Sequence, residues 1–95
     1  MTALTSTLAS APLTVLIVED DFHMQLGCVQ ALQLAGLTVE AVDSAEDAMA
    51  RITPGYAGIV VTDMRLPRAD GLSLVRHCHA LDPDLPVIMI KIGRA

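Results

Sequence analysis

Residues 15–21 read Val-Leu-Ile-Val-Glu-Asp-Asp, and the expected architecture of the chain follows from them. Its four aliphatic residues are typical of a strand buried on both faces, and three acids follow them directly. A second stretch repeats the arrangement, because the largely apolar residues 58–62 lead into Asp63. In an open α/β sheet, ligands bind at the carboxyl ends of the parallel strands. The two stretches therefore predict a sheet that gathers carboxylates at one edge.

The composition predicts one small domain with an aliphatic core, because the 95 residues are 53% hydrophobic and include only one Phe and one Tyr. A net charge of −5 without a basic run argues against nucleic-acid binding, which needs clustered Lys and Arg. No apolar run approaches the roughly 18 residues of a membrane span. Cys28 and Cys78 lack metal-ligand spacing, and we expect buried free thiols of a reducing compartment.

Residues 1–12 are small and polar and lack a positively charged start, so we expect a disordered leader and not a secretion signal. Beyond them the hydrophobic pattern predicts alternating strands and helices. The expected strands cover residues 14–18, 38–41, 59–62 and 87–90, and the expected helices cover residues 22–35, 45–52 and 72–81. Asp21 is a candidate helix cap, and Gly36 is a candidate helix stop. Such alternation with short loops favours a parallel sheet covered on both faces.

The first expected helix carries Phe22, Leu26, Val29 and Leu32 at helical spacing, which predicts an apolar stripe. The last expected strand, residues 87–90, is entirely apolar, as a strand buried on both faces would be. Nothing after it is long enough to cover its edge. We therefore expect a domain that is cut off before its last strand, with an edge that invites pairing with another chain.

The acids Asp20, Asp21 and Asp63 follow two strands that a right-handed crossover places side by side or one apart. Three carboxylates in one pocket repel each other unless a cation joins them, and hard oxygen ligands suit Mg²⁺. A lone carboxylate beside a metal can attack phosphorus, which makes Asp63 a candidate phosphoacceptor. The plainer alternative is that these acids are helix caps and solvated loop residues.

The chain resembles a response-regulator receiver domain of bacterial two-component signalling. Three motifs carry the resemblance: residues 15–21, residues 60–67 (Val-Val-Thr-Asp-Met-Arg-Leu-Pro) and the pair Asp70-Gly71. It extends over residues 14–90. The resemblance implies a flavodoxin-like (CheY-like), doubly wound parallel sheet, here incomplete with four strands in the order 2-1-3-4. Residues 13–95 would then form a partial receiver domain.

The resemblance also implies the roles of the site residues. Asp63 would be the phosphoacceptor, and Asp20, Asp21, Asp63 and the main-chain carbonyl of Arg65 would hold Mg²⁺. The donor would be a phosphohistidine on a sensor histidine kinase, and this chain would be cytoplasmic. The receiver would catalyse this transfer to itself, without being an enzyme for a separate substrate. The sequences of residues 44–48 and 80–87 are similar to the corresponding sequences in receivers of the NtrC/DctD group. Regulators of this group control sigma-54-dependent transcription, often of C4-dicarboxylate transport genes.

Two departures from the family pattern bear on switching. Receivers carry Ser or Thr at the end of the fourth strand, where this chain has Lys91, and they carry a Lys on a fifth strand, before which the sequence stops. An alternative function is therefore an interaction module that self-associates through residues 87–90 without phosphotransfer. A metal-dependent phosphatase is a third hypothesis. It is disfavoured because such enzymes usually need an acid two residues after the nucleophile, where this chain has Arg65.

Overall fold

The computed structural model describes residues 14–64, 66 and 71–90. Four parallel strands form one sheet in the order β2-β1-β3-β4, which confirms the predicted order. The strands are β1 (Thr14–Val18), β2 (Thr38–Val42), β3 (Gly58–Asp63) and β4 (Val87–Ile90), and the helices are α2 (Phe22–Leu34), α3 (Ala45–Arg51) and α4 (Gly71–Leu81). The predicted leader at residues 1–12, Arg65 and Lys91 lie outside the described residues.

The register of the sheet sets the position of the acids. β1 lies between β2 and β3, and Val18 pairs with Val42 on one side and with Thr62 on the other. The first acid after β1 and the acid that ends β3 therefore come at the same level of two neighbouring strands. A right-handed crossover alone left open whether these strands were adjacent or one apart. The family resemblance implied that they are adjacent, and the structure confirms this.

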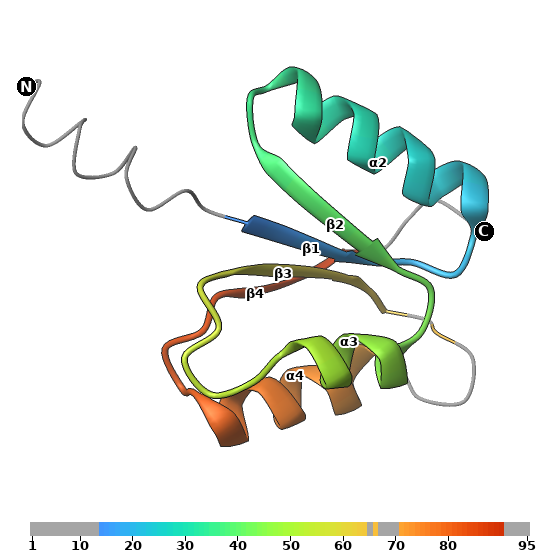
Figure 1. Ribbon diagram of the computed structural model, residues 1–95. Helices are drawn as coiled ribbons and strands as arrows, with labels where there is room; N and C mark the ends of the chain where they lie inside the picture. Colours follow the sequence, from blue (N-terminus) through green and yellow to red (C-terminus); the bar gives the residue numbers. More distant parts are fainter. Residues whose placement is uncertain (1–13, 65, 67–70, 91–95) are drawn as a thin grey trace, which may run out of the picture.

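Helices cover the two faces of the sheet unequally. In Figure 1, α3 and α4 lie together on one face, and α2 lies on the other. The main core is on the α3 and α4 face and is built from aliphatic side chains and one thiol: Leu16, Val18, Val42, Ala45, Ala48, Ile52, Val60, Leu74, Cys78 and Leu85. Because side chains alternate along a strand, the buried Val15 and Ile17 belong to the opposite face, which α2 covers.

The predicted apolar stripe of α2 is not a buried stripe. None of the residues of α2 is buried, and the side chains of Phe22 and Leu26 are 67% and 41% exposed. The physical reason is that, within the described residues, no second helix lies beside α2 on its face of the sheet (Figure 1). Cys28, which we expected to be buried, is half-buried for the same reason, whereas Cys78 is fully buried in the α3 and α4 core.

Local signals account for where the helices begin and end. Gly36 has a φ of +89°, a left-handed conformation that glycine adopts without steric cost, and α2 ends just before it. The Ser44 hydroxyl accepts a hydrogen bond of 3.1 Å from the Asp47 N–H and so caps α3. Each predicted boundary agrees with the structure to within one residue, because these signals are local.

β4 forms one edge of the sheet. It pairs with β3 from Val60 opposite Val87 to Asp63 opposite Ile90, and no other described strand pairs with it. The sequence predicted a strand buried on both faces, but Ile88 is 50% exposed and Met89 is 38% exposed. In the described structure, β4 therefore presents apolar side chains together with an unpaired backbone edge.

Candidate metal centre

Three carboxylates meet where β1 and β3 end. One carboxylate oxygen from each of Glu19, Asp20 and Asp63 lies within 4.8 Å of the other two. Glu19 is 1% exposed and Asp63 is 3% exposed, whereas Asp20 reaches solvent. The group of carboxylates is thus buried at Glu19 and Asp63 and reaches solvent at Asp20.

The surroundings of Glu19 act strongly on the pKa of its carboxyl. Burial raises the pKa of its carboxyl from 4.5 to about 7. A hydrogen bond from the Asp21 N–H to Glu19 Oε2, 2.9 Å long, lowers this pKa, and the negative charge of Asp63 raises it. Glu19 Oε1 is buried and accepts no hydrogen bond from the described residues. A cation would favour the charged form of this carboxyl because it opposes both burial and the charge of Asp63.

Asp21 has a different place. Its Oδ1 accepts hydrogen bonds from the backbone N–H groups of His23 (3.0 Å) and Met24 (3.1 Å), which makes Asp21 the N-cap of α2. The structure therefore brings together Asp20 and Asp63 of the predicted ligands and adds Glu19. Asp21 is not part of this group of carboxylates, and the Arg65 carbonyl lies outside the described residues.

The donor set of the site fits Mg²⁺. Hard carboxylate oxygens are the protein ligands that this ion prefers, and it usually takes only one or two of them besides water and phosphate. Glu19 Oε1, a buried oxygen that accepts no hydrogen bond from the described residues, is a ligand atom that a cation could use at the base of the site. Glu19, Asp20 and Asp63 are the described residues that could hold it.

Sequence reasoning missed Glu19 as a candidate ligand. A signal for it was present, because Asp21 had been recognised as a candidate cap. Once Asp21 is assigned to the helix, the two remaining acids of the stretch are Glu19 and Asp20. Three consecutive acids otherwise look equivalent, and their roles differ only because the strand ends at Val18 and the helix begins at Phe22.

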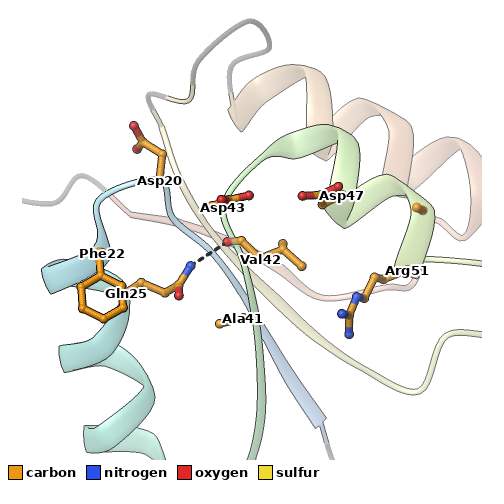
Figure 2. Close-up of a pocket in the computed structure, with 9 residues that line it drawn as sticks. Asp20, Phe22, Gln25, Ala41, Val42, Asp43, Asp47 and Arg51 are labelled. Carbon is orange, nitrogen blue, oxygen red and sulfur yellow. Dashed lines mark hydrogen bonds between the residues drawn. The ribbon is translucent and has the colours of Figure 1, made fainter.

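A cleft of about 670 Å³ adjoins the site between α2 and α3. Nine residues line it: Asp20, Phe22, Gln25, Ala41, Val42, Asp43, Asp47, Ala50 and Arg51. Figure 2 shows Asp20 on the loop after β1, Asp43 and Asp47 at the start of α3, and the amide of Gln25 turned toward the carbonyl of Val42. Asp20 thus belongs both to the cleft and to the group of three carboxylates.

The fold and the acidic site define a signalling receiver of two-component systems. The model of the family described as "Response regulator receiver domain" matches residues 15–93, and the chain belongs to this family. Among curated relatives it is 44% identical over 81 residues to the C4-dicarboxylate transport transcriptional regulatory protein DctD of Rhizobium meliloti. It is 42% identical over 76 residues to the protein of the same name from Pseudomonas aeruginosa.

These matches cover 85% and 80% of this chain but only 18% and 16% of the two regulators. Among solved structures, a response regulator receiver protein from Sinorhizobium medicae superimposes with a TM-score of 0.78 at 32% identity, covering 88% of this chain and 68% of that one. The predicted family and the flavodoxin-like fold are therefore confirmed. None of the described helices is long and apolar enough to span a bilayer.

Proposed function

We propose that this chain accepts a phosphoryl group on Asp63 within a two-component phosphorelay. One observation carries the proposal: the buried carboxylate of Asp63 ends β3 and lies beside those of Glu19 and Asp20. A carboxylate oxygen of Asp63 attacks the phosphorus of a phosphohistidine on a sensor histidine kinase. The P–N bond breaks, the imidazole leaves and takes up a proton, and an aspartyl phosphate remains. The receiver domain catalyses this single transfer to itself.

Mg²⁺ is part of the proposal, with Asp20, Asp63 and Glu19 as its protein ligands. The bound ion would supply positive charge that offsets the charge on the phosphoryl oxygens. The residues of the chain orient the attacking carboxylate and bury it away from bulk water. The roles of Asp21 and the Arg65 carbonyl as further ligands stay predictions, since Asp21 caps α2 and Arg65 is not described.

The relatives support a finer proposal on the pathway. Two of them carry the name of transcriptional regulators of C4-dicarboxylate transport, and each is far longer than the matched region. We propose that the phosphorelay of this receiver controls transcription in the cytoplasm.

Intact-mass spectrometry tests phosphoacceptance. The purified chain is incubated with Mg²⁺ and acetyl phosphate, and we expect it to gain one phosphoryl group. Asp63→Asn removes the nucleophile while keeping its shape, so we expect no gain. Asp84→Asn is the matched control, because Asp84 is an exposed acid in the loop before β4, at the amino ends of the strands and away from the carboxyl ends where Asp63 lies.

Two outcomes would contradict the proposal. Either the unaltered chain gains no phosphoryl group although Mg²⁺ is present, or Asp63→Asn gains as much as the unaltered chain. The Asp84→Asn control must behave as the unaltered chain does. Otherwise the loss in Asp63→Asn reflects lost charge and not a lost nucleophile.

A second candidate function is self-association through β4, with or without phosphotransfer. It is favoured by the half-exposed side chain of Ile88 on an edge strand that pairs only with β3 among the described strands. Two copies related by a two-fold axis would pair their β4 strands in antiparallel orientation and continue the sheet across both molecules.

Light scattering over a range of protein concentrations tests this second candidate. A dimer is expected for the unaltered chain, and Ile88→Lys is expected to yield a monomer because it places a charge on the paired edge. Leu34→Lys is the matched control, since Leu34 is 89% exposed on α2, which packs against β2 and β1 and not against β4. A monomer at every concentration contradicts the proposal.

A further inference from the structure

We propose that Gln25 is a positioning residue of the metal centre, which it serves by holding the backbone between Glu19 and Asp20. This inference rests on the proposed function. Gln25 lies in α2, where it is half-buried and lines the cleft next to Asp20. It is neither acidic nor one of the grouped carboxylates, so its role would be to orient groups that bind the ion.

The amide of Gln25 uses both of its hydrogens on backbone carbonyls of two different strand ends. Its Nε2 donates to the carbonyl oxygen of Glu19 at 3.0 Å and to that of Val42 at 3.1 Å. Figure 2 shows the bond to Val42. Val42 also accepts a hydrogen bond of 3.0 Å from the N–H of Glu19. The backbone of Glu19 is therefore held at its N–H by β2 and at its carbonyl by Gln25.

The hydrogen bond from Gln25 restrains the peptide that sets the directions of the Glu19 and Asp20 side chains. The Glu19 carbonyl belongs to the planar peptide group that joins Glu19 to Asp20, so holding its oxygen restrains the whole plane. In an extended strand, successive side chains point to opposite faces. Glu19 and Asp20 nevertheless each bring a carboxylate oxygen within 4.8 Å of one from Asp63. The peptide that Gln25 holds lies just beyond the end of β1 at Val18 and leads into the bend at Asp20.

The backbone carbonyl that anchors Gln25 on β2 and the carboxylate of Asp63 lie on opposite sides of β1. Val42 ends β2, on one side of β1, whereas Asp63 ends β3, on the other side. Gln25 thus ties the loop that carries the acids to β2, while the carboxylates themselves meet Asp63. Without the amide, the loop keeps its residues but loses this anchor, and the metal ligands have to be ordered when the ion binds.

Calorimetric titration of the full chain with MgCl₂ tests the role. Gln25→Leu and Gln25→Met both remove the two donors and keep a residue that favours helix. Because partners that orient metal ligands contribute 10–100-fold to affinity, we expect about tenfold weaker Mg²⁺ binding in both variants. Gln30→Leu, an exposed Gln on the same helix, is the matched control, for which we expect a change below about twofold.

Phosphoryl gain from acetyl phosphate supplies a second readout. A positioning role predicts that the Mg²⁺ concentration for half-maximal rate rises about tenfold in the Gln25 variants, whereas the rate at saturating Mg²⁺ recovers. A merely structural role would lower the melting temperature and leave the Mg²⁺ dependence unchanged.

Nuclear magnetic resonance of the unaltered chain keeps the inference testable if the variants fail to fold. We expect the side-chain NH₂ protons of Gln25 to shift on addition of Mg²⁺ with the midpoint of the calorimetric titration, and those of Gln30 to stay in place. This inference alone is overturned if folded Gln25 variants bind Mg²⁺ with unchanged affinity. It is also overturned if the chemical shifts of the Gln25 side-chain NH₂ protons do not change when Mg²⁺ is added. No Mg²⁺ binding by the unaltered chain overturns the proposed metal site and this inference together.

Discussion

Gly71 lies against the backbone of Asp63. A Cβ on Gly71 would collide with the carbonyl oxygen of Asp63, and the Gly71 N–H donates a hydrogen bond of 3.1 Å to the carbonyl of Met64. The first residue of α4 is thus in direct contact with the strand end that carries the proposed phosphoacceptor. A side chain at this position must displace that backbone, because the obstructing atom is not the end of a flexible side chain.

Gly71→Ala is expected to lower the free energy of unfolding by about 1–3 kcal/mol and to slow phosphoryl gain, because the added methyl group moves the Asp63 backbone. Denaturant titration and intact-mass time courses measure the two effects. Gly27→Ala is the matched control. No atom lies within 4 Å of a Cβ built on Gly27, and in α2 the change is expected to stabilise the protein by up to about 1 kcal/mol. Equal effects of both substitutions would contradict the contact argument.

The metal-free domain is expected to lose stability as pH rises from about 4.5 to about 7. The pKa of Glu19 is raised on folding, so the folded state binds more protons than the unfolded state in this window, and the free energy of unfolding falls with pH. The loss is on the order of 3 kcal/mol, since the pKa rises from 4.5 to about 7 and one pKa unit corresponds to about 1.4 kcal/mol. Glu19→Gln removes this titration, and its denaturant midpoints should depend less on pH. Parallel pH profiles for both proteins would refute the assignment.

Mg²⁺ is expected to raise the melting temperature more at pH 8 than at pH 5, because protons and the ion compete for the Glu19 carboxylate. An ion present at 100 times its dissociation constant stabilises by about 2.7 kcal/mol. Chelation should reverse the effect. Thermal unfolding followed by circular dichroism measures it, and Asp20→Asn should reduce the shift. A shift that is independent of pH would mean that Glu19 does not bind the ion.

Asp21 offers a direct comparison of cap and ligand. Asp21→Ala is expected to cost about 0.5–2 kcal/mol of stability because α2 loses its N-cap, whereas Asp21→Asn keeps a capping oxygen and should be close to neutral. Calorimetry should find Mg²⁺ affinity nearly unchanged in Asp21→Asn and weakened in Asp20→Asn. If both Asn variants bind Mg²⁺ equally poorly, Asp21 is a metal ligand, as the sequence predicted.

Leu74→Ala is expected to lower the free energy of unfolding by about 2–5 kcal/mol, because Leu74 is fully buried in the core under α4. Leu34→Ala removes the same atoms from an 89% exposed position and should change stability by less than about 0.5 kcal/mol. Urea denaturation of both variants measures the difference. Similar losses would mean that α2 is covered in solution.

Much of the fold could be predicted from the sequence because its signals are local. The apolar run of residues 15–18 predicts β1, and Gly36 and Ser44 mark a helix end and a helix start by their own backbone and hydroxyl chemistry. The burial of α2 could not be predicted in this way. Phe22 and Leu26 have helical spacing, but whether such a stripe is covered depends on a neighbour that is distant in sequence.

The amino-acid order by itself determined the alternation of elements, the family, and the meeting of carboxylates from β1 and β3, because each follows from short runs of side chains and their periodicity. Only the tertiary structure decided which acids meet. β1 ends at Val18 and α2 begins at Phe22, so Glu19 and Asp20 lie in the connection and meet Asp63, while Asp21 caps α2. The contact of Gly71 with Asp63 and the anchoring of the acidic loop by Gln25 join residues far apart in the chain or in different elements, and such pairs become neighbours only when the sheet and its helices pack.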